Sequence, residues 1–504
     1  MRRNIQNLVT YLIYLGAFIF LLTCLMLAIT YIPQKAIQKH MQESAEILAE
    51  RPPTWQILPG INSSKVHPYA DMLTLNIAYH FGDDVRTYDS FSFFDKLQYS
   101  NSEKLKAVMW AKYYGAPEDT DESIKLFKQS VDNRLPANKE YLRYWHGSAG
   151  IVRLLHIFLN IHQIYILHSI ILITLLVYLI MLLLRSCFFR EAIALLISLT
   201  MVSIWFVPIC LEYYWCFLVM AAVSIIAVRV ATKGSWQKAT ILFFFTGIIT
   251  AFLDFLTTET VTLVIPLLLM VSIGTTTVKR ISENDALSDM RDGVTLNLIL
   301  KTCFSWLSGF SLMWISKWIL AALILQEDVL PYVTAHIEER IGGDPNGKSQ
   351  AAYAIGAVGR NLRCLLPFDY GRFGYFVLGI LTGVAVALIA AHSIRINKKS
   401  DKQLLLWYSA IGCIPIVRYA VLHNHAWYHR SFTYRALAGS VLALCFIISE
   451  LFKRRKCLDS ADTAQIRGGS ENGPAQPYYP YALSERRRKH RLFHRTGSEL
   501  PVLH

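Results

Sequence analysis

The chain has 504 residues, of which 54% are hydrophobic and only 17% are charged, and its formal net charge is +14 at pH 7. A soluble protein carries about 25% charged residues and lacks a succession of apolar blocks long enough to cross a bilayer. The composition excludes a soluble enzyme, a disordered scaffold and a nucleic-acid-binding protein, and it predicts an all-α polytopic membrane protein.

Ten apolar blocks of roughly 17–25 residues, the length that crosses the apolar core of a bilayer, predict about ten transmembrane helices. The blocks are residues 8–32, 166–184, 191–208, 212–228, 239–255, 259–275, 297–323, 373–395, 403–421 and 435–452. The first block follows Arg2 and Arg3 without a small-residue cleavage site, so we expect it to be a membrane anchor.

The basic residues between the blocks indicate one orientation. They gather at alternate junctions, at Arg185 and Arg190; Arg229, Lys233 and Lys238; Lys279 and Arg280; Arg395, Lys398 and Lys399; and Lys453–Lys456. Because cytoplasmic loops carry an excess of Lys and Arg, we expect these junctions and both chain termini on the cytoplasmic side of the plasma membrane.

These patterns divide the chain into six parts. The parts are a cytoplasmic N-terminus with the first span (1–32), a helical outer-face domain (33–165), spans two to seven (166–325), an outer-face loop (326–372), spans eight to ten (373–452) and a basic, disordered cytoplasmic tail (453–504). Polar residues interrupt the apolar positions of residues 151–168, which predicts that the outer domain ends in an amphipathic helix at the interface. We expect the tail to contact anionic membrane lipids and no nucleic acid.

Acidic residues lie at two points next to apolar segments on the predicted outer face. Asp71 begins an apolar segment soon after the first span, either as a helix cap or as a general base. Asp254 and Glu259 lie in the turn between the fifth and sixth spans, where they are either solvated or directed inward between the helices. Charged groups within a membrane usually line a functional site.

Cationic residues lie on the same predicted face. Lys317, in the seventh span, either reaches the interface or remains buried, ready to bind a phosphate. His425 and His429 share one helix face, and with Arg435 they suit an anionic headgroup better than a metal, which lacks a third ligand. The nine cysteines form no CxxC pair, so neither a disulfide framework nor a zinc site is expected, while a divalent cation stays an open alternative.

The segments that carry these residues resemble the GT-C superfamily of polytopic membrane glycosyltransferases, of the bacterial surface-polysaccharide type. The segments are YADMLTLN, RYWHG, DFLTTETVTL, WISKW and NHAWYHRSFTYR, and the resemblance in layout covers residues 1–452. It implies transfer of a sugar from a polyprenyl-phosphate-linked donor to a cell-envelope glycan or lipid acceptor at the outer face.

The resemblance also implies a role for each predicted site residue. Asp71 is the base that deprotonates the acceptor hydroxyl. The donor phosphate is bound by Lys317, His425, His429 and Arg435, and the sugar or acceptor by Asn76, Trp145, His146, Asp254 and Glu259. Arg418, inside the ninth span, has no role in this prediction.

Three alternatives remain open. A flippase or transporter for lipid-linked oligosaccharide needs polar groups in both halves of the membrane, but the cytoplasmic halves of the spans are almost uninterrupted Leu, Ile, Val and Ala. A polymerase or ligase acts on the same lipid-linked sugars and is not separated by these motifs. A receptor or scaffold leaves Lys317 and Asp254 unexplained.

Overall fold

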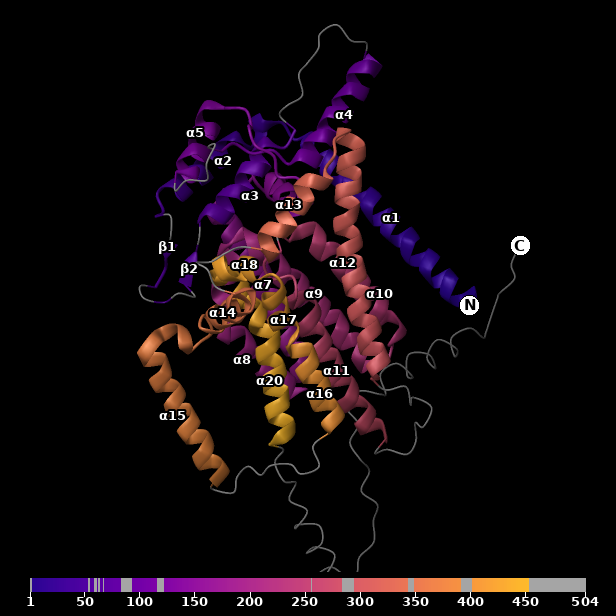
Figure 1. Ribbon diagram of the computed structural model, residues 1–504, viewed down its shortest axis with the longest axis vertical. Coiled ribbons are helices and arrows are strands. Elements are labelled where there is room, and N and C mark those ends of the chain that lie inside the picture. Colours follow the sequence, from indigo (N-terminus) through magenta and orange to yellow (C-terminus); the bar gives the residue numbers. More distant parts are fainter. Residues whose placement is uncertain are drawn as a thin grey trace, which may run out of the picture. The chain divides into compact units, whose positions relative to one another are not determined.

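The protein is described here by a computed structural model, which describes residues 2–52, 55–58, 61, 64–66, 68–82, 93–115, 122–254, 256–282, 294–342, 349–390 and 401–452 (Figure 1). All of these residues belong to one compact unit, Met1–Lys453. The predicted basic tail, 453–504, lies outside the described residues. Within them the fold is helical, apart from the short antiparallel pair β1 (Trp55–Gln56) and β2 (Lys65–Val66) and an isolated bridge between Tyr113 and Lys139.

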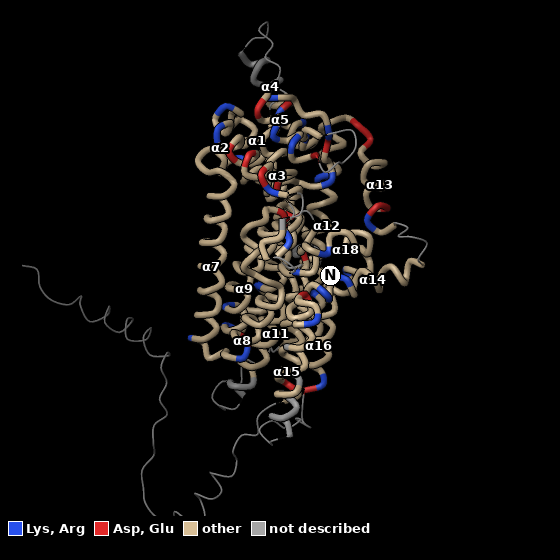
Figure 2. The backbone as a smooth tube through the Cα atoms, turned by 90° about the vertical axis from the view of Figure 1, so that its left-hand side faces the viewer, with Lys and Arg blue, Asp and Glu red and all other residues tan. Residues whose placement is uncertain are grey.

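A group of helices follows the first apolar helix, α1 (Arg2–Thr30), and lies at the top of Figure 1. The group comprises α2 (Gln34–Ala49), α3 (Pro68–His80), α4 (Phe93–Trp110), α5 (Ser123–Asn133) and α6 (Gly147–Leu155). In Figure 2 many of the charged residues lie on this group and on α13 (Leu330–Ile341), whereas the middle of α7 (Ile161–Arg185) carries almost none. We keep the name outer domain for α2–α6, because these helices form the segment that the sequence predicts on the outer face.

The junction between the outer domain and α7 differs from the single amphipathic helix predicted for residues 151–168. The helix α6 ends at Leu155, and Asn160 caps the N-terminus of α7 in a capping box with Gln163. The polar residues of this segment therefore mark a break between two helices. Arg153 connects α6 to the end of α3, because its guanidinium donates to the carbonyl oxygens of Ala78 and Tyr79 at 2.7 and 2.8 Å.

Seven helical segments of the described chain are long and apolar enough to cross a membrane, which indicates a multi-pass membrane protein. They are Val9–Thr30, Ile161–Arg185, Leu211–Thr232, Val261–Val278, Leu296–Leu325, Lys402–Val421 and Arg430–Leu451. The corresponding helices after α7 are α9 (Leu211–Thr232), α11 (Val261–Ser282), α12 (Leu296–Leu325), α16 (Lys402–Gly412) with α17 (Ile414–Val421), and α19 (Arg430–Thr433) with η4 (Tyr434–Leu437) and α20 (Ala438–Leu451).

The remaining three predicted spans are not among these seven, so the count of ten stays a prediction. The block 191–208 forms α8 (Phe189–Met201) and a 3-10 helix, η2 (Ile204–Ile209), separated by Ser203, which has a left-handed backbone. The block 239–255 forms an apolar helix of only 17 residues, α10 (Gln237–Leu253). The block 373–395 begins as α15 (Gly371–Ala390).

Two glycines allow α10 and α12 to pack backbone against backbone. A Cβ atom at Gly309 of α12 would lie 2.2 Å from the carbonyl oxygen of Phe244, and one at Gly247 of α10 would lie 2.2 Å from the carbonyl oxygen of Trp306. Small residues permit this approach in membrane proteins. The contact fixes the end of α10, from which the candidate site begins.

We expect Gly309→Ala to lower the free energy of unfolding by about 1–3 kcal/mol, because the added methyl group meets backbone that cannot rotate away. Thermal unfolding of the detergent-solubilised protein measures the effect. Gly16→Ala in α1 is the matched control, because a Cβ atom there has no neighbour within 4 Å. Equal unfolding temperatures for the two variants would contradict the close packing.

Candidate functional site

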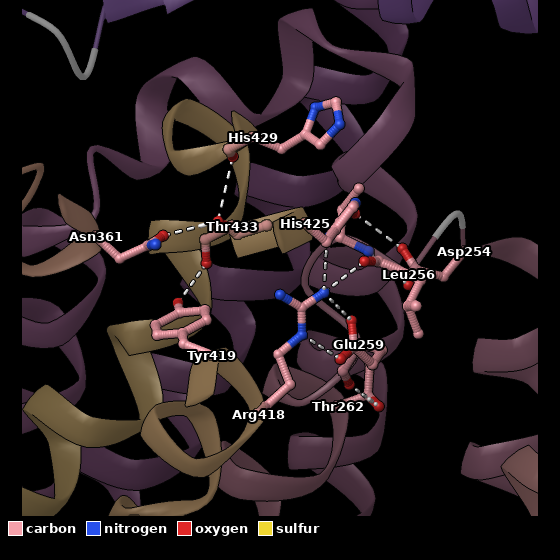
Figure 3. Close-up of polar contacts among 11 residues, drawn as sticks. Asp254, Leu256, Glu259, Thr262, Asn361, Arg418, Tyr419, His425, His429 and Thr433 are labelled. Atoms are coloured by element: carbon pink, nitrogen blue, oxygen red, sulfur yellow. Dashed lines mark hydrogen bonds and ion pairs between the residues drawn. The ribbon is translucent and has the colours of Figure 1, made fainter. Parts of the chain in front are cut away.

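A buried ion pair joins α17 to the loop between α10 and α11 (Figure 3). Arg418 Nε lies 2.8 Å from Glu259 Oε1, and Arg418 Nη2 donates to the carbonyl oxygen of Leu256 at 2.5 Å. Arg418 is 8% exposed and Glu259 4%. Arg418, which the sequence left without a role, therefore holds the residue that was predicted to bind sugar or acceptor.

Asp254 shapes the loop that presents Glu259. It follows the last residue of α10, and its carboxylate accepts from the backbone N–H and the hydroxyl of Thr257 at 3.1 and 3.0 Å. Such a turn reverses the chain within a few residues. Asp254 is only 3% exposed, so the inward-facing alternative for this turn is confirmed. Burial and the negative charge of Glu259 raise the pKa of Asp254.

His425, in the short helix α18 (His423–Tyr428), completes the network in Figure 3. Its Nδ1 lies 3.3 Å from Arg418 Nη2. Because arginine only donates, Nδ1 must accept, which places the ring hydrogen of a neutral imidazole on Nε2. Burial and the charges of Arg340 and Arg418 hold the pKa of His425 well below its usual value. The ring therefore offers an anion a hydrogen bond rather than a charge.

His429, the other predicted histidine, lies beside His425 but outside the network. The two ring centroids are 4.8 Å apart, and His429 also stacks on Phe432 at 6.1 Å. Its side chain is exposed. The predicted proximity of the two histidines is confirmed, while a phosphate-binding role for His429 stays a prediction.

Asp71, the predicted base, lies in the first turn of α3 and is fully buried. It accepts hydrogen bonds from the Tyr165 hydroxyl and, at 2.7 Å, from the backbone N–H of Leu211 at the N-terminus of α9. A carboxylate stabilises a helix N-terminus through both the hydrogen bond and the helix dipole. The alternative of a helix cap is thus observed, although the capped helix is α9 rather than α3.

Burial raises the pKa of Asp71 from 3.8 to about 6, against the opposing effects of Tyr165, Leu211 and Arg51. Between these two values the native state keeps a proton that the unfolded state has released, so stability falls as the pH rises through this window. We expect the protein to lose about 3 kcal/mol between pH 4 and pH 7 from this group.

Chemical denaturation across this pH range measures that loss. Asp71→Asn is expected to remove it, because the amide does not titrate. Asp132→Asn, an exposed acid of α5, is the matched control and should retain the wild-type slope. An unchanged slope in Asp71→Asn would show that another group causes the dependence.

Glu212 is a fourth acid of this region and was missed by the sequence analysis. It lies in the first turn of α9, and charge interactions connect it to Asp71, Asp254 and Arg340. Its Oε2 atom is buried and has no hydrogen-bond partner among the described residues. The sequence signal was weak, because Glu212 begins an apolar block, where an acid is typical of a solvated helix end.

Arginines bring positive charge to the same cluster. Arg340, in the last turn of α13, acts electrostatically on both Glu212 and His425. One nitrogen of Arg340 and one of Arg418, the Nη1 atom in each case, are buried without a partner among the described residues. Arg143 lies 3.8 Å from Glu339 of α13. We refer to Asp71, Glu212, Asp254, Glu259, Arg340, Arg418 and His425 as the polar cluster.

Lys317 is buried, which agrees with the second of its two predicted alternatives. It forms no hydrogen bond with the polar cluster among the described residues. Its Nζ donates to the carbonyl oxygens of Val108 and Met109, at 3.0 and 2.9 Å, in the last turn of α4. These carbonyls have no partner within their own helix. Lys317 therefore attaches the outer domain to α12.

We expect Lys317→Met to lower the free energy of unfolding by about 1–3 kcal/mol, because it leaves two buried carbonyl groups without donors. Thermal unfolding in detergent measures the loss. Lys301→Met is the control, since Lys301 is exposed on the same helix. A loss of phosphate binding without a loss of stability would instead support the predicted role.

The other predicted residues are buried and use their polar groups within the protein. The Asn76 amide donates to the carbonyl of Tyr114 at 2.7 Å and accepts from its N–H at 2.9 Å. The indole of Trp145 donates to Met313 at 2.7 Å. His146 Nε2 lies 2.7 Å from the Tyr141 carbonyl oxygen. The Arg435 guanidinium donates to the Ser431 carbonyl at 2.5 Å and lies over the Tyr213 ring at 4.4 Å. These contacts indicate that the four side chains stabilise the fold.

A second buried group of charges lies at the end of α7 away from the outer domain. Arg190 Nη2 and the Ser272 hydroxyl lie 2.7 and 2.6 Å from Glu191 Oε1, and Arg190 Nη1 lies 3.8 Å from Glu450. Glu191 is 3% exposed and Glu450 2%. Both acids fall at the edges of apolar blocks, so the predicted apolar character of the cytoplasmic halves of the spans stays a prediction.

Among the described residues, no group of three or more His, Cys, Asp or Glu side chains is placed to hold a metal ion, and a divalent cation stays a prediction. No protein-family model, curated protein or solved structure matches the chain. The resemblance to the GT-C superfamily thus also stays a prediction.

Proposed function

We propose that the chain is a membrane glycosyltransferase, which moves a sugar from a polyprenyl-phosphate-linked donor to a cell-envelope glycan or lipid acceptor at the outer face of the plasma membrane. The observation that carries the proposal is the composition of the polar cluster. It contains three buried charged atoms without partners among the described residues, Glu212 Oε2, Arg340 Nη1 and Arg418 Nη1. A sugar phosphate needs both an acidic group and cationic groups.

The chemistry requires a base and a site for the leaving phosphate. As the acceptor oxygen attacks the anomeric carbon, its proton passes to a carboxylate, and the bond between that carbon and the phosphate oxygen breaks. The phosphate leaves with the electron pair. Charge thus develops on the acceptor and on the phosphate, where a base and arginine side chains lower the barrier. This balance describes an inverting displacement, in which the acceptor oxygen attacks the anomeric carbon directly.

Glu212 is the carboxylate best placed to be the base. Asp71 and Asp254 accept hydrogen bonds within the protein, and Glu259 is paired with Arg418. The carboxylate of Glu212 has no hydrogen bond among the described residues, and its side chain is partly exposed. Asp71 then acts by holding the N-terminus of α9, which carries Glu212.

A transfer assay tests the function. Membranes that contain the wild-type protein receive radiolabelled polyprenyl-phosphate sugars and extracted envelope acceptors, and membranes without it are the control. We expect label in the acceptor fraction only with the protein. Lack of transfer, together with accumulation of lipid-linked sugar in one leaflet of a deletion strain, would contradict the proposal and favour a flippase.

Transport is the second candidate function, because of the buried group formed by Arg190, Glu191, Ser272 and Glu450. Polar groups in both halves of the spans are what a path across the membrane requires. These groups, however, bind one another, and Arg190 also lies over the ring of Phe446 at 5.4 Å. We therefore favour a role in packing α8, α11 and α20 together. A polymerase or ligase would be recognised in the transfer assay by labelled oligosaccharide rather than single sugars.

A further inference from the structure

We propose that Arg340 of α13 and Arg418 of α17, with His425 beside Arg418, bind the phosphate group of a prenyl phosphate. This inference rests on the proposed function, since it locates the donor's phosphate. It differs from the sequence prediction, in which Lys317 and Arg435 contributed the charges.

Arg418 is held so that one side of its guanidinium stays available. Nε and Nη2 are used by Glu259, the Leu256 carbonyl and His425. The remaining nitrogen, Nη1, is buried and has no partner among the described residues. Three contacts from two elements thus fix the orientation of Nη1 before any ligand binds. Preorganised donors of this kind bind an anion without losing side-chain entropy.

Arg340 supplies a positive charge that acts on Glu212 without forming an ion pair with it. Glu259 pairs with Arg418 and Glu339 lies 3.8 Å from Arg143, whereas Arg340 forms no ion pair with a described residue. Its Nη1 is also buried without a partner there. Leaving a guanidinium hydrogen unsatisfied in a buried position is costly, so the arrangement favours an anionic ligand.

The position of Arg340 on α13 is fixed by neighbouring contacts. The Asn424 side-chain amide of α18 donates to the Glu339 carbonyl at 2.5 Å, and the Arg340 guanidinium lies 5.9 Å from the centre of the Tyr144 ring. Asn424 is the neighbour of His425 in sequence. The hydrogen bond from Asn424 therefore brings the end of α13 to the His425 ring, on which both arginines act.

The surroundings favour a lipid phosphate over a free one. Val417 and Val421, on either side of Arg418 in α17, are 58% and 54% exposed, and Tyr428 of α18 is 66% exposed. In a membrane this apolar surface faces lipid. A prenyl chain can therefore lie along α17 while its phosphate reaches the two guanidinium groups, which bind phosphate through paired hydrogen bonds.

Lys317 and Arg435 are less suited to this role. Lys317 donates to two backbone carbonyls of α4. Arg435 donates to the Ser431 carbonyl, and its guanidinium lies over the rings of Tyr213 and Tyr434 at 4.4 and 4.8 Å. Both cations thus have their strongest partners within the protein.

Binding to the purified full-length protein in phosphatidylcholine nanodiscs tests the proposal by calorimetry. The probes are farnesyl phosphate, farnesol and inorganic phosphate. We expect farnesyl phosphate to bind at least about tenfold more tightly than either of the others, because farnesol lacks the phosphate and inorganic phosphate lacks the prenyl chain. Equal binding of farnesol would show that the site does not bind phosphate, and equal binding of inorganic phosphate would overturn the lipid source.

The variants identify the two arginines. Arg340→Gln removes a cation that forms no ion pair with a described acid, and we expect it to weaken binding of farnesyl phosphate by about tenfold or more. Arg418→Lys keeps a charge beside Glu259 but loses the fork of the guanidinium, and it should weaken binding likewise. Arg229→Gln is the matched control, because Arg229 is exposed at the end of α9 away from Glu212. Wild-type affinity in Arg340→Gln would overturn the site.

The binding and transfer assays fail independently. Binding of farnesyl phosphate that depends on Arg340 but occurs without sugar transfer would remove the proposed function and leave the phosphate site. If the wild-type protein transferred sugar but Arg340→Gln bound farnesyl phosphate as tightly as the wild type, the proposed function would stand and the phosphate site would be removed.

Discussion

Replacing Arg418 by methionine is expected to lower the free energy of unfolding by about 3–5 kcal/mol, because the charge of Glu259 then stays buried without its partner. Arg418 and Glu259 are 8% and 4% exposed, and their closest atoms are 2.8 Å apart. Water therefore cannot replace the guanidinium. Thermal and denaturant-induced unfolding in one detergent would measure the loss.

The double variant Arg418→Met with Glu259→Gln is the matched control for this prediction. It removes both charges, so we expect it to recover most of the stability that the single variant loses. Arg229→Met, at an exposed position, should leave stability unchanged. If the single variant were as stable as the wild type, the pair would not fix α17 to the loop between α10 and α11.

The membrane character of the chain could be predicted from its sequence, because block length and composition alone decide it. The ends of the helices were harder. Asn160 and Gln163 form a capping box that the sequence contains, yet the apolar residues on both sides hid the break before α7. Pro208 lies inside the 3-10 helix η2, within a block that hydropathy alone makes continuous. Composition thus predicts apolar segments more reliably than it predicts uninterrupted helices.

The grouping of several residues of the candidate site could be predicted from the sequence, but their pairings could not. Asp254, Glu259 and His425 were identified as groups of the outer face, and they do come together. The partner of Glu259 was not foreseen, since Arg418 lies 159 positions away in sequence. Sequence position indicates how deep a residue lies along a span. It does not tell which neighbouring helix the side chain faces.

The same limit explains why buried polar residues were assigned to ligands. Lys317 and Asn76 are polar residues in apolar surroundings, which is typical of a functional site. Their partners are backbone groups at Met109 and Tyr114, and no side-chain pattern marks such groups. Glu212 was not identified from the sequence, because an acid at the start of an apolar block is typical of a solvated helix end, although the charges of Asp71 and Asp254 act on it.

Glu212→Gln is expected to lower the rate of sugar transfer by about 10²–10⁴-fold, the usual contribution of a general base. The amide has nearly the same shape but cannot take the acceptor's proton. Initial rates with radiolabelled polyprenyl-phosphate sugar at a fixed amount of inserted protein measure the effect. Binding of farnesyl phosphate should stay near the wild-type value, because this substitution leaves Arg340 and Arg418 in place.

Comparison with Asp71→Asn and Glu338→Gln decides which acid is the base. One oxygen of Asp71 accepts from the backbone N–H of Leu211 in α9 and the other from the Tyr165 hydroxyl in α7, so we expect Asp71→Asn to reduce transfer only through the position of Glu212. Its pH profile should then keep the wild-type acidic limb, whereas Glu212→Gln should lose that limb. Glu338→Gln, on the exposed side of α13, should transfer sugar normally. If transfer instead required Asp71 and tolerated Glu212→Gln, the base would be Asp71, and the Glu212 carboxylate would have no part in the reaction.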